Sequence, residues 1–114
     1  MLNNLKIKIF ADGADLENIK NLCKNPIIKG FTTNPSLMKK KGIVDYKNFA
    51  LDVLKITENK PVSFEIFADD LIEMESQANE IASWGKNVNV KIPITNTKGE
   101  STVSLIEKLS NSII

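Results

Sequence analysis

The stretch NVNVKIPIT, residues 87–95, alternates apolar and polar side chains in the way that a β-strand does. Val88, Val90 and Ile92 fall on one face of such a strand, whereas Asn89 and Lys91 fall on the other. A lysine is unfavourable in the middle of so apolar a strand, because burial of its charge costs free energy. The pattern predicts a strand with one face packed against the protein core and one face that carries polar, functional side chains.

Three more segments of this kind precede residues 87–95, and a helical pattern follows each of the four. Strands are expected at 5–11, 27–33, 62–68 and 88–94, and helices at 14–24, 46–57, 71–84 and 102–111. Strands that alternate with helices pair in parallel through right-handed crossovers. Periodicity alone leaves two architectures open: an open doubly wound sheet, and a (β/α)8 barrel, which typically needs about 250 residues.

The amino-acid composition argues against several classes of function. A chain of 114 residues forms at most one domain, and its net charge of +1 gives no reason to expect nucleic-acid or membrane binding. All 15 basic residues are lysine and there is no histidine, which excludes His-based metal sites and Ser-His catalysis. The single Cys23 cannot form an internal disulfide. No cofactor or metal is predicted, and without a signal-peptide pattern the expected location is the cytoplasm.

Each predicted strand has, at or near its carboxyl end, a side chain that could take part in catalysis or substrate binding. These side chains are Asp12, Asn34, Glu65 and Lys91. Side chains on one face converge where parallel strands end, and barrel enzymes place their chemistry there. Burial of Lys91 would lower the pKa of its amine, and a neutral amine can form a Schiff base with a carbonyl substrate. Glu65, one strand earlier, could move protons during that reaction.

Each of these residues also has an ordinary structural interpretation. Lys91 could be an exposed lysine of an edge strand, and Glu65 could merely neutralise a buried lysine. Asp12 could cap the first helix, and Asn34, before Pro35, is a good turn residue. The occurrence of all four on successive strand ends favours a functional site.

Four segments carry a resemblance to a known family. The sequences KIFADGAD (8–15), GFTTNPSL (30–37), VSFEIFA (62–68) and NVNVKIPIT (87–95) resemble motifs of the transaldolase family. This family comprises class I Schiff-base aldolases on a (β/α)8 barrel and includes a group similar to fructose 6-phosphate aldolase. The order and spacing match over nearly the whole chain. The resemblance implies the first four of eight βα units of a TIM barrel, with residues 1–114 as its N-terminal half.

The resemblance also implies a reaction and roles for individual residues. The family transfers a dihydroxyacetone unit between sugar phosphates in the pentose phosphate pathway: sedoheptulose 7-phosphate and glyceraldehyde 3-phosphate give erythrose 4-phosphate and fructose 6-phosphate. Lys91 would form the imine, Glu65 would act as acid and base through a water molecule, and Asp12 would handle a substrate hydroxyl proton. Substrate-binding roles fall to three residues: Asn34, Thr32 and Thr33. The related fructose 6-phosphate aldolases carry glutamine in place of Glu65, so the glutamate favours transaldolase.

The sequence departs from the family in length. Its members complete eight βα units, and their phosphate-binding residues lie on later strands than those of this chain. The chain alone is therefore expected to be weakly active or inactive. Three explanations stay open: a fragment or truncated product, a half-barrel completed by self-association into a homo-oligomer, and an inactive remnant. The rival class of function is a non-catalytic, self-associating half-barrel module.

Overall fold

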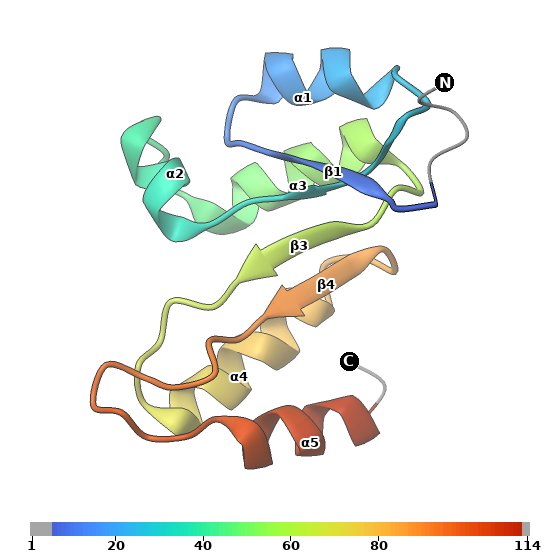
Figure 1. Ribbon diagram of the computed structural model, residues 1–114. Helices are drawn as coiled ribbons and strands as arrows, with labels where there is room; N and C mark the ends of the chain where they lie inside the picture. Colours follow the sequence, from blue (N-terminus) through green and yellow to red (C-terminus); the bar gives the residue numbers. More distant parts are fainter. Residues whose placement is uncertain (1–5, 113–114) are drawn as a thin grey trace.

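The computed structural model describes residues 6–112 and contains four strands that alternate with helices (Figure 1). The elements are β1 (Ile9–Asp12), α1 (Leu16–Cys23), β2 (Ile28–Thr32), α2 (Pro35–Lys40), α3 (Tyr46–Thr57), β3 (Val62–Glu65), α4 (Leu71–Ala82), β4 (Val88–Lys91) and α5 (Val103–Asn111). The predicted alternation of strands and helices is confirmed. The short helix α2 was not predicted.

Aspartates that precede the helices explain where three of them begin. Asp15 accepts hydrogen bonds from backbone N–H groups in the first turn of α1, and Asp45 and Asp70 do the same for α3 and α4. Such N-caps satisfy backbone donors that have no partner within the helix. The cap of α1 is therefore Asp15, and the suggestion that Asp12 caps this helix is wrong.

The strands are shorter than predicted, for reasons that the structure makes visible. The strand predicted at 5–11 is β1, which begins at Ile9; Leu5 lies outside the described residues. β3 ends at Glu65 because the side-chain oxygen of Gln77 accepts the N–H groups of Phe67 and Ala68, at 2.7 and 2.9 Å. β4 ends before Pro93, which has no N–H group to donate to a neighbouring strand.

The sheet has the strand order β1-β2-β3-β4, and all three pairs are parallel. A doubly wound sheet reverses its strand order at a switch point, whereas consecutive order is the arrangement of a barrel. α1 packs against α3 and β2, α3 against β3, and α4 against β4 and α5 (Figure 1). The described residues therefore form four consecutive βα units of a TIM barrel, as predicted, and the doubly wound alternative is wrong.

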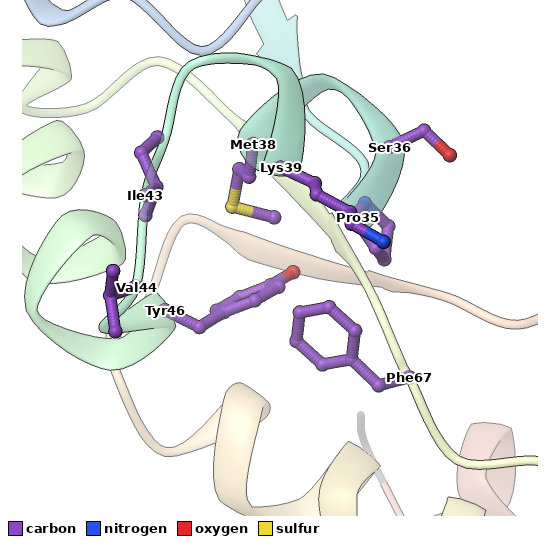
Figure 2. Close-up of a pocket in the computed structure, with 8 residues that line it drawn as sticks. All are labelled: Pro35, Ser36, Met38, Lys39, Ile43, Val44, Tyr46 and Phe67. Atoms are coloured by element: carbon purple, nitrogen blue, oxygen red, sulfur yellow. The ribbon is translucent and has the colours of Figure 1, made fainter.

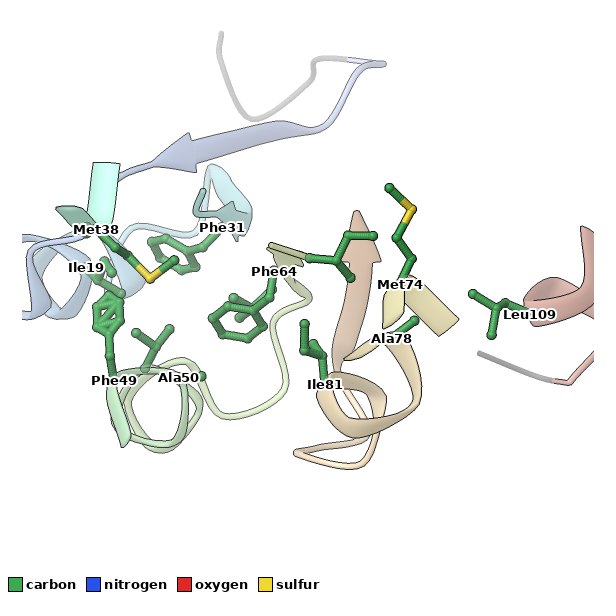
Figure 3. Close-up of a cluster of buried hydrophobic side chains, with 14 of the residues drawn as sticks. Ile19, Phe31, Met38, Phe49, Ala50, Phe64, Met74, Ala78, Ile81 and Leu109 are labelled. Atoms are coloured by element: carbon green, nitrogen blue, oxygen red, sulfur yellow. The ribbon is translucent and has the colours of Figure 1, made fainter. Parts of the chain in front are cut away.

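One face of the sheet is covered by helices and the other is open. The strands contribute Phe31, Val62, Phe64 and Ile66 to the core, and the helices contribute Ile19, Met38, Phe49, Ala50, Val53, Met74, Ala78, Ile81, Leu105 and Leu109. Figure 3 shows Phe31 and Phe64 packed toward Phe49 and Ala50 of α3. The opposite face corresponds to the inner wall of a barrel, and it carries the polar residues.

Candidate functional site on the open face of the sheet

A row of polar side chains crosses the open face near the carboxyl ends of the strands. Asp12 on β1 is the register partner of Thr32 on β2, and Thr32 is that of Ser63 on β3. Ser63 is in turn paired with Asn89 on β4. The Thr32 hydroxyl donates a hydrogen bond of 2.8 Å to the Asp12 carboxylate, which orients that carboxylate over the open face.

Glu65 and Lys91 form the next row, two residues closer to the carboxyl edge. They are register partners at the ends of β3 and β4, and their side chains share the open face. Neighbouring parallel strands lie about 4.8 Å apart, so both side chains can reach one small molecule above this edge. This is the juxtaposition that a Schiff-base lysine and its proton-transfer partner need.

The sequence left open whether Lys91 is buried or exposed. Lys91 is exposed, and among the described residues no ion pair joins it to the half-buried Glu65. Within residues 6–112 it is thus an exposed lysine of an edge strand, and Glu65 does not neutralise a buried lysine there. The reason is that β4 is an edge strand, with no neighbour on its far side among residues 6–112. Desolvation of this amine requires a further wall of protein.

The structure separates the three residues that were predicted to bind substrate. Thr32 lies on the open face beside Asp12. Thr33 is fully buried on the helix side, where its hydroxyl approaches the carbonyl oxygen of Ser63 at 3.4 Å, so a substrate on the open face can contact only Thr32. The side-chain oxygen of Asn34 accepts the N–H of Leu37 at 2.9 Å and caps α2. Its amide nitrogen is the group that can donate to a substrate oxygen.

Tyr46, the first residue of α3, is a contributor that the sequence did not reveal. Its hydroxyl donates a hydrogen bond of 2.8 Å to the main-chain carbonyl of Glu65. The rings of Phe64, Phe67 and Trp84 surround it, with an edge-to-face distance of 4.4 Å between the centroids of Tyr46 and Phe67. Burial strongly raises the pKa of Tyr46, and the Glu65 carboxylate raises it further. Tyr46 therefore remains a protonated donor that holds the end of β3.

A pocket of about 330 Å³ lies beside Tyr46 on the helix side (Figure 2). It is lined by Pro35, Ser36, Met38, Lys39, Ile43, Val44, Tyr46 and Phe67. Figure 2 shows the rings of Tyr46 and Phe67 next to each other on this pocket. None of the residues predicted for catalysis or substrate binding lines it, so the open face and not this pocket is the candidate site.

The rim of the open face is held by a second network. The carboxylate of Asp69, after β3, accepts the backbone N–H and the hydroxyl of Thr97 at 2.8 and 2.6 Å. Asn96 adds a hydrogen bond of 3.0 Å to the carbonyl of Asp69. The two bonds from Thr97 hold the pKa of Asp69 below its ordinary value. The loop between β4 and α5 is thereby tied to the connection that leaves β3.

Residues 6–112 also bear on two further classes of site, metal sites and membrane spans. No three His, Cys, Asp or Glu side chains of this part gather where they could hold a metal ion, and the prediction of a metal-free reaction stays a prediction. None of the described helices is long and apolar enough to span a bilayer.

These features define a parallel β/α protein of the barrel type, with a lysine, two carboxylates and an amide at the carboxyl ends of its strands. The chain belongs to the transaldolase/fructose-6-phosphate aldolase family, whose model matches residues 9–114. The family predicted from the four sequence motifs is thus confirmed.

Curated relatives agree with this assignment. A probable transaldolase of Dehalococcoides mccartyi is 43% identical over 102 residues, which cover 90% of this chain and 47% of that protein. Probable transaldolases of Streptococcus agalactiae and Methanococcus maripaludis are 38% and 37% identical over the same length, which covers 46% of each. The chain spans about half the length of the curated relatives it matches.

Proposed function

We propose that residues 1–114 correspond to the N-terminal half of a transaldolase barrel and carry the Schiff-base part of its active site. The substrates would be sugar phosphates of the pentose phosphate pathway. A dihydroxyacetone unit would pass from sedoheptulose 7-phosphate to glyceraldehyde 3-phosphate. The observation that carries this proposal is the pairing of Glu65 with Lys91 on the same open face that holds Asp12.

The residues take complementary roles in this reaction. The amine of Lys91 adds to the ketone carbon of the donor sugar, and loss of water gives a protonated imine. Glu65 supplies and removes the protons for these steps through a water molecule. Asp12 takes the proton of the hydroxyl group beside the bond that breaks. The electrons of that carbon–carbon bond pass to the imine, the aldehyde leaves, and the resulting enamine adds to the acceptor aldehyde, whose oxygen takes back the proton from Asp12. Water then hydrolyses the new imine, which releases the product ketose and restores the amine of Lys91.

Substrate hydroxyl groups would be oriented by Thr32, which is already bonded to Asp12, and by the amide nitrogen of Asn34. Thr33 would act indirectly, since it packs behind the sheet. The carboxylate of Glu65 supports transfer to an acceptor sugar, whereas a glutamine at this position would support free aldol cleavage, the alternative activity. The reaction is expected in the cytoplasm.

The exposed Lys91 explains why the chain alone should show little or no turnover. Within the described residues, no wall of protein excludes water from this amine, so an imine formed on it would be open to hydrolysis. The phosphate-binding residues implied by the resemblance are also outside these four βα units. Full activity should therefore need further strands opposite the open face.

Borohydride trapping tests the imine directly. The chain, and a version extended by the second half of a relative, would be incubated with fructose 6-phosphate and borohydride and then analysed by peptide mass. We expect an adduct on Lys91 in the extended version, its loss in Lys91→Gln, and its retention in Lys86→Gln, which changes an exposed lysine just before β4. An adduct that survives Lys91→Gln would refute the proposal.

The role of Glu65 is tested in the same extended version. Glu65→Gln should leave the imine able to form slowly, while transfer falls by about 10²–10⁴-fold, the usual range for loss of a general acid–base group. Glu107→Gln, which changes an exposed glutamate on α5, is the matched control. Transfer at the unaltered rate in Glu65→Gln would remove Glu65 from the mechanism.

A further inference from the structure

The pocket beside Tyr46 has no part in the proposed reaction, and its lining combines apolar surface with a single charge. Six of its eight lining residues are apolar or aromatic: Pro35, Met38, Ile43, Val44, Tyr46 and Phe67. The other two are Ser36 and Lys39 of α2. Figure 2 shows these two at one end of the pocket, with Ile43 and Val44 at the other. The volume of about 330 Å³ lies at the lower end of the roughly 300–1,000 Å³ that is typical of small-molecule sites.

The apolar part of this pocket is in contact with water. Val44 is 98% exposed and Phe67 is 52% exposed, although both side chains are large and apolar. Contact of apolar surface with water costs free energy, and exposed apolar side chains that gather at a hollow mark binding sites. The Tyr46 hydroxyl already donates its hydrogen bond to the Glu65 carbonyl, so Tyr46 offers its ring to a ligand. A ligand for this part of the pocket needs an apolar body.

The polar end of the pocket favours an anion. Lys39 is the charged residue of the lining, and among the described residues no ion pair occupies it, whereas Lys41 contacts Asp15 at 3.8 Å. The Ser36 hydroxyl adds one more hydrogen-bond donor. One amine and one hydroxyl match a single carboxylate. A sugar phosphate fits poorly, because most of its hydroxyl groups would meet apolar walls without a hydrogen-bond partner.

We propose that this pocket is a binding site, separate from the open face, for a small aromatic carboxylate. The carboxylate pairs with the Lys39 amine and accepts a hydrogen bond from Ser36. The aromatic body lies against Val44 and Phe67 and removes their side chains from water. All lining residues lie between positions 35 and 67, and both β2 and β3 have neighbours on each side within the chain. The site therefore does not depend on what adjoins β1 or β4.

Tyr46 links this site to the open face. Its ring lines the pocket, and its hydroxyl donates the hydrogen bond of 2.8 Å to the Glu65 carbonyl. A ligand that contacts the ring therefore acts on the backbone of Glu65. Binding stands whether or not Glu65 is catalytic, whereas an effect of the ligand on transfer rests on the proposed function as well.

Titration with 3-phenylpropionate, followed by NMR, tests the binding. In the chain and in the version extended by the second half of a relative, we expect saturable shifts of the amide signals of Lys39, Val44 and Phe67. Val44→Asp puts a charge at the apolar end and should weaken binding at least fivefold. Ile72→Asp is the matched control, because Ile72 is 80% exposed on α4 and lies outside the pocket. Shifts that do not saturate, or that are absent in the extended version, would overturn the proposal.

The role of the charge is tested by two neighbouring lysines. Lys39→Gln should weaken binding of 3-phenylpropionate about two- to fivefold, the range expected for an exposed ion pair. The neutral 3-phenylpropionamide should bind the wild-type protein as weakly. Lys40→Gln is the control, since Lys40 is exposed and does not line this pocket. Equal dissociation constants for Lys39→Gln and Lys40→Gln would overturn the assignment of an anionic ligand.

Tyr46→Phe tests the link to Glu65. The ligand should shift the amide signal of Ile66, which follows the Glu65 carbonyl, in the wild-type protein but not in Tyr46→Phe, which keeps the ring. An equal shift in both proteins would contradict the link. All these titrations are made without sugar. Binding of 3-phenylpropionate without a trapped imine would contradict the proposed reaction alone, and a trapped imine without such binding would contradict this site alone.

Discussion

At the scale of single residues, the position of Glu65 depends on a neighbour that never touches the open face. The Tyr46 hydroxyl reaches the Glu65 carbonyl from the helix side, so the backbone of Glu65 is fixed while its carboxylate points toward the open face. Burial keeps the tyrosine protonated, because a buried phenolate would lose its hydration. A hydrogen bond from the core therefore positions a residue of the candidate site.

Tyr46→Phe should remove this hydrogen bond while keeping the ring contacts with Phe64, Phe67 and Trp84. We expect the free energy of unfolding to fall by about 1–3 kcal/mol, because the Glu65 carbonyl loses its partner in a partly buried place. Urea denaturation measures the loss. NMR should also show a shift of the Ile66 amide, which follows that carbonyl. An unmoved Ile66 signal and an unaltered unfolding midpoint would show that the hydrogen bond contributes nothing.

At the scale of elements, Gly30 sets how closely β2 approaches its neighbours. A Cβ atom at this position would lie 2.5 Å from the Phe10 ring on β1 and 2.7 Å from the carbonyl oxygen of Pro61. The same carbonyl accepts the N–H of Phe31 at 2.9 Å, so it cannot retreat without weakening the sheet. Glycine is required here by the close approach of two neighbours.

Gly30→Ala should therefore lower the free energy of unfolding by about 1–3 kcal/mol, the usual cost of overpacking. Gly13→Ala is the matched control, since nothing lies within 4 Å of a Cβ atom added there. Urea denaturation of both variants measures the difference. Equal unfolding midpoints for the two variants would contradict the steric argument.

The tie between Asp69 and Thr97 should depend on pH. The pKa of Asp69 is lowered in the folded protein, so its stabilising effect is complete above the ordinary pKa of about 3.9 and is lost as pH falls through the lower folded value. Asp69→Asn should be less stable than wild type at pH 6–7, and the difference should shrink below about pH 4. Asp52→Asn, an exposed aspartate on α3, is the control. A difference that does not vary with pH would count against this role of the carboxylate.

The sequence predicted most of the strands and helices, but not the residues at which they end. Alternation along residues 62–65 and 88–91 correctly assigned Glu65 and Lys91 to one face. The end of β3 depends on the hydrogen bond from the Phe67 N–H to the side chain of Gln77, which lies twelve residues after Glu65. No local sequence pattern predicts that hydrogen bond. The short helix α2 has a local signal, Asn34 as N-cap before Pro35, but the same pair is also typical of a turn.

At the scale of the whole molecule, helices cover one face of the sheet, and within residues 6–112 each edge strand has a neighbour on one side only. The face that packs against helices follows from hydrophobic periodicity, and this part was predicted. The sequence left both a buried and an exposed Lys91 open, because burial at an edge strand depends on what lies beyond it. Enclosure of this lysine therefore depends on the protein beyond the β4 edge and not on its own strand.

Hydrogen exchange should reveal this dependence. β2 and β3 have neighbours on both sides within the chain, so their amides should be protected. Within the described residues β1 and β4 have one neighbour each, and we expect their amides to exchange faster than those of β2 and β3. Protection of both edge strands equal to that of β2 and β3 would mean that another element covers them.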